Sequence, residues 1–348
     1  MESVSTTWSS PANIALVKYW GKRGDQVPQN PSISMTLAES VTTTTVVLSR
    51  PAGTPEHRFL FEGKAEPAFE LRVNGYLRRV LCMLPGLAGY AIEIQSSNNF
   101  PHSSGISSSA SFKSSLAVCL IRAEELITGF RLPADAFYRK ASLLARLGSG
   151  SAARSVFGGF SIWGHSAAVD GSSDEYAVPI DHKVHPVFKT YRDAILVISS
   201  QPKSLSSSNG HRLMEQNPYG PRRFDSAREN IRQLLGMLGN GDQAGFIQLV
   251  EEEAMTLHGL IQASPGGPIL LEPGTIRAIR LIRDYRRESG SLACFTLDAG
   301  PNIHLLYPES EAARIRDFIS TTLAPLCENG RWIDDRIGTG PYEHTPVF

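Results

Sequence analysis

A serine-rich segment of the chain has the residue types that bind phosphate. It reads NNFPHSSGISSSASFKSSLAVCL, from Asn98 to Leu120, and it leads directly into apolar residues at helical spacing. A helix over 106–128 would put the serines at its N-terminus, where free N–H groups and the helix dipole favour anions. Gly105 would let the backbone approach a ligand closely. An ordinary serine N-cap is the alternative interpretation.

A second segment, GSGSAARSVFGG over 148–159, is also rich in glycine and serine. It contains the GxGxxA spacing of dinucleotide-binding turns, but a helical pattern precedes it where that fold requires a strand. Ser149, Ser151 and Arg154 are better candidates to hold a substrate phosphate, since the guanidinium group binds phosphate through two parallel hydrogen bonds. The chain has neither a GxxxxGK[ST] loop nor a GxSxG motif, so P-loop and serine hydrolase chemistry lack their motifs.

The overall composition limits the classes of protein to consider. The 348 residues suggest one large or two ordinary domains, and 41% hydrophobic with 20% charged residues indicate a substantial core. Basic and acidic residues both number 34, so bulk charge does not favour binding to nucleic acid or to a membrane surface. The cysteines are widely spaced, and neither a signal peptide nor an apolar span of about 20 residues is recognised, so we expect a reduced, cytoplasmic protein.

The elements that must position these candidate residues follow a mixed order along the chain. Alternating or β-branched runs predict strands over 40–49, 90–97, 158–163, 193–199, 291–298 and 302–308. Helical spacing predicts helices over 70–84, 106–128, 134–148, 222–238, 241–262, 275–289 and 309–320. Strands followed by helices and again by strands favour an α+β fold over a regular βαβ array.

Four segments together resemble the diphosphomevalonate decarboxylase (mevalonate 5-diphosphate decarboxylase) family of the GHMP kinase superfamily. They are ANIALVKYWGKR (12–23), SSNNFPHSSGISSSAS (96–111), GSGSAARSVFGGFSIW (148–163) and TLDAGPNIHLLYP (296–308). PKSLSSSNGHRLM (202–214) and RIGTGP (336–341) resemble family segments less distinctively. The matches occur in order and cover nearly the whole chain.

The resemblance implies a GHMP kinase fold, with a ribosomal-S5-like N-terminal domain over 1–188 and a ferredoxin-like C-terminal domain over 189–348. It also implies an activity that uses ATP and Mg²⁺. Mevalonate 5-diphosphate would be phosphorylated on its tertiary 3-hydroxyl and would then lose phosphate and CO₂ to give isopentenyl diphosphate. A homodimer is compatible with the resemblance, and metal ligands cannot be assigned from it.

Family positions imply roles for individual residues. Asp298 matches the catalytic aspartate, Arg154 would hold Asp298 and the substrate carboxylate, and Lys18 would balance charge near the transferred phosphate. The residues that would bind the substrate are Tyr19, Trp20, Gly21, Lys22, Arg72, Ser149, Gly150, Ser151, Arg154 and Ser208. The residues that would bind ATP are Asn98, Ser103, Ser104, Gly105, Ser107, Ser108 and Ser109.

Each catalytic candidate also has a structural interpretation. Asp298 precedes Ala-Gly-Pro and fits a turn or cap residue, Lys18 fits an exposed charge at the end of a strand, and Arg154 fits a structural ion pair. His258, within a predicted helix, is interpreted as a structural histidine. The combination of these residues in matching motifs favours the catalytic interpretation for the first three.

The serine-rich segment departs from the family pattern at two positions. Phe112 stands where the family usually has glycine, and Lys113 where it usually has an aromatic residue. Lys113 lies on the apolar side of the predicted helix, so we expect its long stem to carry the ammonium outward; the alternative is that it reaches back to the triphosphate. Phe112 could narrow the nucleotide pocket.

Two other functions remain open from the sequence. One is a GHMP-fold kinase or decarboxylase that acts on another 3-hydroxy acid, and the other is a catalytically silent nucleotide-binding homologue. A kinase would form a phosphorylated product without CO₂, whereas a silent homologue would bind without consuming ATP.

Overall fold

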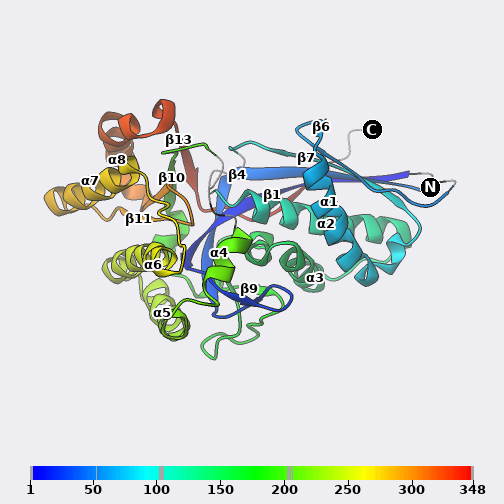
Figure 1. The fold of residues 1–348 in the computed structure, drawn as a ribbon, viewed down its shortest axis with the longest axis horizontal. Coiled ribbons are helices and arrows are strands. Elements are labelled where there is room, and N and C mark those ends of the chain that lie inside the picture. Colours follow the sequence, from blue (N-terminus) through cyan, green and yellow to red (C-terminus); the bar gives the residue numbers. More distant parts are fainter. Residues whose placement is uncertain (1–2, 52, 102–105, 202–204, 206, 346–348) are drawn as a thin grey trace.

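The computed structural model describes residues 3–51, 53–101, 106–201, 205 and 207–345. Long strands and helices α1–α3 form one lobe, and a second sheet with helices α5–α8 forms the other (Figure 1). Helix α4, over Ser207–Leu213, lies between the two lobes in this view.

The first sheet is built around two long strands, β1 (Ser3–Val17) and β4 (Ser32–Ser49), which pair antiparallel. The strand order is β14-β1-β4-β7-β5-β6, and β8 and β9 extend it beside the first part of β4. All of these pairs are antiparallel except β5 with β7. The remaining strands of this lobe are β5 (Arg58–Phe61), β6 (Lys64–Ala65), β7 (Ala91–Asn98), β8 (Phe160–Trp163), β9 (Ala177–Pro179), β14 (Tyr342–His344) and the separate pair β2 (Lys22–Arg23) and β3 (Val27–Pro28).

Helix α2 (Ser108–Thr128) packs on this sheet through small hydroxyl side chains. Ser111 and Ser115 lie one turn apart and contact Thr42 and Thr44 of β4, each at 2.6 Å between hydroxyl oxygens. Serines thus let the helix approach the sheet closely while their polar atoms remain paired. Helices α1 (Pro67–Val80) and α3 (Ala134–Gly148) complete an apolar core with α2.

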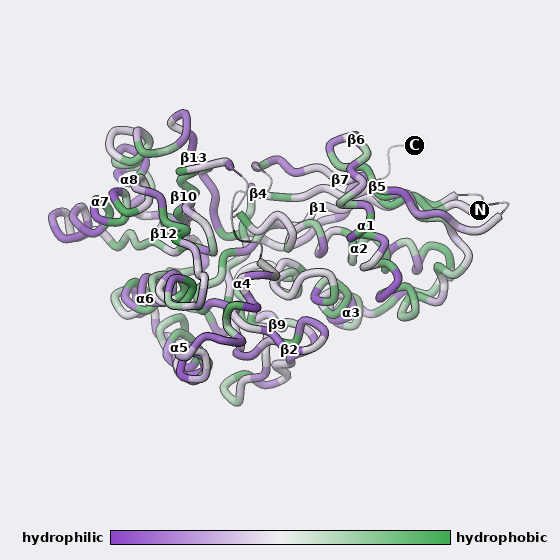
Figure 2. The backbone as a smooth tube through the Cα atoms, viewed as in Figure 1, coloured by the Kyte–Doolittle hydropathy of each residue, from purple (hydrophilic) through white to green (hydrophobic). Residues whose placement is uncertain are grey.

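The second sheet has the antiparallel order β11-β12-β10-β13. Its strands are β10 (Arg192–Leu196), β11 (Cys294–Thr296), β12 (Ile303–Tyr307) and β13 (Trp332–Arg336). Helices α5 (Gly220–Asn240), α6 (Gln243–Ala263), α7 (Pro273–Ser289) and α8 (Ala312–Phe318) belong to this lobe. The outer end of α7 is hydrophilic and lies at the left edge of the molecule (Figure 2), whereas Ala278, Ile279 and Ile282 of the same helix join the core.

Short helical segments connect these elements. The 3₁₀ segments are Leu81–Met83, Pro85–Leu87, Gly150–Val156, Asp181–Lys183, Pro186–Thr190, Glu309–Glu311, Ala324–Leu326 and Glu328–Gly330, and a π-helical turn covers Ile319–Leu323.

The predicted α+β class is correct, and several predicted bounds are close. The helix predicted over 134–148 is α3, and the helix predicted over 106–128 begins two residues later as α2. The strand predicted over 40–49 is only the second part of β4. The helix predicted over 309–320 is broken into a 3₁₀ turn, α8 and a π turn. Strand β1 was not expected, because Pro11 and an irregular register interrupt its alternation.

Candidate active site at the end of strand β1

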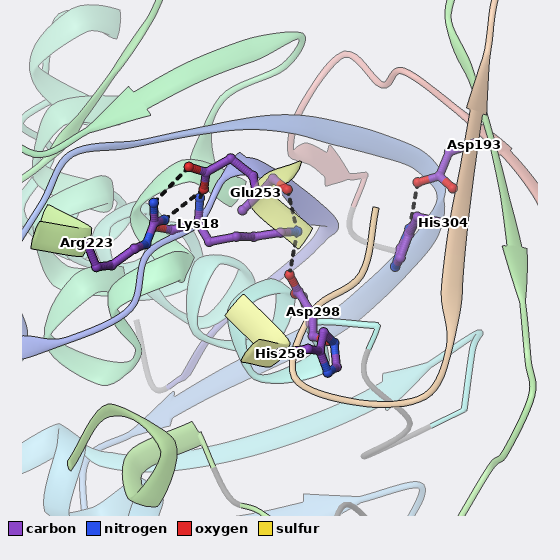
Figure 3. A network of polar contacts seen from close by, with 9 residues as sticks. Lys18, Asp193, Arg223, Glu253, His258, Asp298 and His304 are labelled. Atoms are coloured by element: carbon purple, nitrogen blue, oxygen red, sulfur yellow. Dashed lines mark hydrogen bonds and ion pairs between the residues drawn. The ribbon is translucent and has the colours of Figure 1, made fainter. Parts of the chain in front are cut away.

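Lys18 and Asp298 form a partly buried ion pair between the lobes. Lys18 follows β1 directly, and its Nζ lies 3.2 Å from Asp298 Oδ1 and donates to the Ala15 carbonyl at 2.6 Å (Figure 3). The Lys18 side chain is 2% exposed and that of Asp298 26%, so the carboxylate is the more accessible group of the pair. Burial lowers the pKa of Lys18, and the charges of Asp298 and Glu253 oppose this decrease.

Asp298 is also tied to the beginning of helix α2. Ser107 precedes that helix and donates through Oγ to Asp298 Oδ2 over 3.2 Å. Ser107 has a φ of 53°, which is uncommon for a residue with a side chain, and it does not cap the helix with its hydroxyl. The geometry therefore brings the carboxylate to a helix N-terminus without a side-chain cap, which is a place suited to phosphate.

His258 contacts the main chain of Asp298. This histidine is buried on α6, and its Nε2 lies 3.0 Å from the main-chain oxygen of Asp298 (Figure 3). The sequence interpretation of a structural histidine fits this contact, which fixes the backbone rather than the carboxylate.

Arg154 lies in the 3₁₀ segment Gly150–Val156 and is 2% exposed. Its Nη1 donates to the Ser32 hydroxyl, and its Nε has no hydrogen-bond partner among the described residues. Burial lowers the pKa of Arg154 to about 10, while the charge of Asp298 opposes the decrease. An interior guanidinium with an unused donor is suited to hold an anionic reactant beside Asp298.

The backbone of Lys18 is held by a buried ion pair that sequence reasoning missed. Glu253 on α6 accepts from the Lys18 main-chain N–H at 2.9 Å, and Arg223 on α5 donates to the Lys18 carbonyl at 3.2 Å. Arg223 and Glu253 bind each other through two contacts of 2.8 and 2.7 Å and are 3% and 1% exposed. Asn230 adds a third donor to Glu253 at 2.5 Å. We refer to Arg223 and Glu253 as the Lys18 clamp.

The residues after Lys18 line the same region. Tyr19 stacks edge-on against Trp163, and Trp20 lies beside His211 with a ring separation of 5.0 Å. The hydroxyl of Tyr19 and the indole N–H of Trp20 are buried without a partner among the described residues. Lys22 is half-buried, and burial together with Arg212 and Arg79 lowers its pKa.

Gly21 allows the chain to turn between Trp20 and Lys22. Its φ is 96°, its N–H donates to His211 Nδ1 at 3.0 Å, and a Cβ there would lie 2.8 Å from the Phe224 ring. Both the positive φ and the close ring exclude a side chain at this position.

Other predicted substrate residues come from two helices and the segment after α3. Gly150 lies against Tyr19 and Trp163, and Ser149 and Ser151 flank it. Arg72 on α1 is exposed and stacks over Phe69 at 4.4 Å from the ring centroid. Ser208 belongs to α4, but its side chain lies outside the described part of the structure.

The predicted ATP residues are only partly described. Ser103, Ser104 and Gly105 fall outside the described residues. Asn98 ends β7, accepts from the Thr42 hydroxyl at 2.7 Å and has a buried side-chain N–H₂ without a partner in the described segments. Ser107 contacts Asp298 as described above, Ser108 begins α2, and Ser109 is exposed on its first turn.

Lys113 does not turn outward, so that prediction was wrong. The residue is 9% exposed and its ammonium lies 4.4 Å from the centroid of the Tyr76 ring and 4.7 Å from that of Phe112. Helical side chains lean towards the N-terminus, and here that direction points between α1 and the end of α3 rather than to solvent.

Within the described part of the chain, no group of three or more acidic, histidine or cysteine side chains is arranged to hold a metal ion. Mg²⁺ commonly takes phosphate oxygens and water with few protein ligands, so the hydroxyls at the beginning of α2 fit an ion that arrives with a nucleotide. Among the described residues, no helix is long and apolar enough to cross a membrane.

Comparison with known proteins gives a consistent result across the chain. Residues 10–177 match the diphosphomevalonate decarboxylase-like N-terminal domain, and residues 194–337 match the mevalonate 5-diphosphate decarboxylase C-terminal domain. The chain is 33% identical over 345 residues to a diphosphomevalonate decarboxylase from Eremothecium gossypii, covering 91% of this chain and 80% of that protein.

Solved structures of similar proteins share the fold over the full length. A mevalonate diphosphate decarboxylase from Staphylococcus aureus is 27% identical, with a TM-score of 0.85 over 99% of this chain and 98% of that one. A structure of MDDEF in complex with MVAPP, AMPPCP and magnesium is 26% identical, with a TM-score of 0.83 over 99% of this chain and all of that one.

Proposed function

This chain belongs to the diphosphomevalonate decarboxylase family and has its GHMP kinase fold, and from this premise we propose how its residues carry out the family reaction. The protein is an enzyme that catalyses the ATP-dependent decarboxylation of mevalonate 5-diphosphate to isopentenyl diphosphate. The single observation that carries the residue assignment is the position of the Asp298 carboxylate. One oxygen lies 3.2 Å from the ammonium of Lys18, and the other lies 3.2 Å from the hydroxyl that precedes helix α2.

Asp298 orients the tertiary 3-hydroxyl of the substrate and accepts its proton. A neighbouring ammonium stabilises the carboxylate and makes it a weak base, so orientation comes first and proton transfer occurs late, as the hydroxyl oxygen bonds to phosphorus. Lys18 balances the negative charge that gathers on the transferred phosphoryl group. Phosphorylation is needed because hydroxide is a poor leaving group, whereas phosphate is a good one.

Arg154 holds the substrate carboxylate. Its buried guanidinium keeps a donor without a protein partner, and it lies close enough to Asp298 for their charges to interact. When the 3-phosphate leaves, the electrons of the bond to the carboxyl carbon form the new double bond and CO₂ is released. A fixed arginine keeps that bond aligned with the departing oxygen.

The diphosphate end of the substrate binds along the segment that follows Lys18 and beside the segment that follows α3. We assign to this region Tyr19, Trp20, Gly21 and Lys22 from the segment after β1, Ser149, Gly150 and Ser151 from the segment after α3, and Arg72 and Ser208. The half-buried ammonium of Lys22 and the unpartnered hydroxyl of Tyr19 support this assignment.

ATP binds at the beginning of α2, through Asn98, Ser103, Ser104, Gly105, Ser107, Ser108 and Ser109. Mg²⁺, when bound with the nucleotide, neutralises phosphate charge during transfer. The uncapped N-terminus of α2 and the left-handed backbone of Ser107 support this assignment.

The domain division near residue 188, a cytoplasmic location and a homodimer belong to the same proposal. Strand β14 returns from the C-terminal half to pair with β1, so a chain cut at 188 would lose one edge of the first sheet. Light scattering of the purified protein tests the dimer.

The test of the function is one assay with Mg-ATP and mevalonate 5-diphosphate in which ADP, phosphate, CO₂ and isopentenyl diphosphate are measured together. Equal amounts of all four products support the proposal. A phosphorylated product without CO₂ would indicate a kinase, and substrate binding without ADP formation would indicate a silent homologue.

A further inference from the structure

Lys113 is a buried cation without a hydrogen-bonding partner in the described part of the chain. It lies on the second turn of α2, 9% exposed, and its ammonium makes no hydrogen bond with the described residues. The ammonium lies against the faces of two rings, those of Tyr76 on α1 and of the adjacent Phe112. The hydroxyl of Tyr76 is likewise buried and unpaired in the described part of the protein. Such polar atoms are costly unless a ligand completes their bonding.

The lysine lies between two parts of the assigned diphosphate region. Its stem passes over Gly148, where a Cβ would be 2.6 Å from Lys113 Cδ. Gly148 precedes Ser149 directly and ends α3. On the α1 side, Arg72 is near enough for its charge to act on Lys113. Lys113 therefore lies with Arg72 on one side and Ser149 on the other.

The surroundings of Lys113 carry excess positive charge. From α1 it is faced by Arg72 and by the neutral phenol of Tyr76, and from the end of α3 by Gly148, which has no ionisable group. Burial and then Arg72 lower its pKa to about 7. Among the described residues, no carboxylate forms an ion pair with Lys113. An anion placed beside the ammonium would remove this penalty.

We propose that Lys113 is a specificity-determining residue that binds the terminal diphosphate of the substrate, together with Arg72 and the hydroxyl of Tyr76. This inference rests on the proposed function, because it takes the ligand to be a diphosphate ester. It also gives a reason for lysine at a position where the family usually has an aromatic residue. The second cation raises selectivity for a diphosphate over a monophosphate, because the fully ionised diphosphate carries one more negative charge and a second phosphate group.

The proposal predicts that binding takes up a proton. Below about pH 7 Lys113 is already charged in the free protein, so binding adds no proton to it. Above that pH the free lysine is mostly neutral, and the diphosphate raises its pKa, so binding takes up as much as one proton there. The affinity that Lys113 contributes should therefore decrease as the pH rises.

The experiment is calorimetric titration with mevalonate 5-diphosphate, without ATP, at pH 6.5 and 8.0 in two buffers of different ionisation enthalpy. We expect Lys113→Met to weaken binding about tenfold at pH 6.5, as for loss of a bond to a charged group, and to abolish the proton uptake seen at pH 8.0. Lys113→Arg, which keeps the charge, should retain part of the affinity. Lys140→Met is the matched control and should change neither quantity, since Lys140 lies on α3 and is paired with Glu124 of α2.

Three results would overturn the role of Lys113. They are unchanged affinity of Lys113→Met for mevalonate 5-diphosphate, proton uptake that survives the substitution, or, in a separate titration with ATP, a loss confined to ATP affinity. Inorganic pyrophosphate, used as a second probe, separates this inference from the proposed function. If pyrophosphate binding depends on Lys113 while mevalonate 5-diphosphate is not turned over, the proposed function is wrong and the proposed diphosphate subsite is supported.

Discussion

Replacement of Glu253 by glutamine tests whether the Lys18 clamp positions Lys18, which we propose to be catalytic. The carboxylate of Glu253 accepts from the Lys18 N–H and from both ends of the Arg223 fork. Glutamine keeps the shape and one acceptor oxygen, but it leaves Arg223 as a buried charge without its counterion. The substitution should therefore affect both folding stability and turnover.

The two effects have different expected sizes. Removal of one partner from a buried ion pair costs about 3–5 kcal/mol of folding stability. The bond from Glu253 to the Lys18 N–H is charge-assisted, and such bonds contribute about 1.5–3 kcal/mol. If that energy selects the backbone position from which Lys18 reaches Asp298, its loss lowers turnover about tenfold to a hundredfold, since each 1.4 kcal/mol is a factor of ten.

A double variant separates the effect on the position of Lys18 from the effect on folding stability. Arg223→Met with Glu253→Leu removes both charges, and apolar replacement of a buried pair is often neutral or stabilising. We expect the double variant to regain much of the stability that Glu253→Gln loses, and to keep the low turnover because the Lys18 backbone has lost both clamp residues and keeps only the bond from Asn30 to its carbonyl among the described contacts.

The assay is CO₂ release at saturating substrates together with thermal unfolding, and Glu251→Gln is the matched control. Glu251 lies on the same helix, is 5% exposed and is likewise paired with arginines, but its partners are Arg283 and Arg286 of α7. It should lose stability and keep its turnover. Equal turnover of the Glu253→Gln and Glu251→Gln variants would refute the positioning role.

Four further predictions follow from the same geometry. Asp298→Asn should retain the fold and ATP affinity and lose about a hundredfold or more in turnover, as for a positioned base; near-normal turnover would remove Asp298 from the mechanism. Arg154→Lys should lower turnover as well as substrate affinity, since an ammonium cannot reproduce the planar fork, and unchanged kinetics would make the arginine structural. Phe112→Gly should lower the unfolding free energy by about 2 kcal/mol without improving ATP binding, because Phe112 packs against Phe59 at 5.4 Å between ring centroids; tighter ATP binding would instead indicate a steric block. Lys113→Met should be more stable than the wild type at pH 6.5, and the difference measured in urea should decrease between about pH 7 and 10.5, where the unfolded chain binds the proton that the native lysine has lost; a difference independent of pH would contradict the buried lysine.

Sequence patterns identified helices with an apolar face and strands that form a short apolar run, and they missed a long strand whose pattern is interrupted. Helix α3 has a clear apolar stripe, and its predicted bounds agree with the structure. Strand β1 was missed because its residues neither alternate between apolar and polar nor form a simple apolar run. The strand is buried along most of its length, and its pairing register shifts near Pro11. Lys18 directly follows β1, so the bounds of a strand that positions the site could not be predicted from the sequence pattern.

Motifs selected candidate residues for the site, but they gave no indication of the residues that hold these candidates in position. Lys18, Arg154 and Asp298 could be selected because each stands in a distinctive short segment. Arg223 and Glu253 stand in helices where charged residues usually face water, and only the packing of α5 and α6 against the end of β1 buries them on the Lys18 backbone. The prediction for Lys113 was wrong for a related reason. Whether a long side chain on a helix reaches solvent depends on the elements packed around it, and here α1 and Gly148 block the direction towards solvent. A buried charge without a partner in the described part of the protein therefore gives information that sequence motifs do not. For Lys113, we infer that the anionic substrate provides the missing counterion.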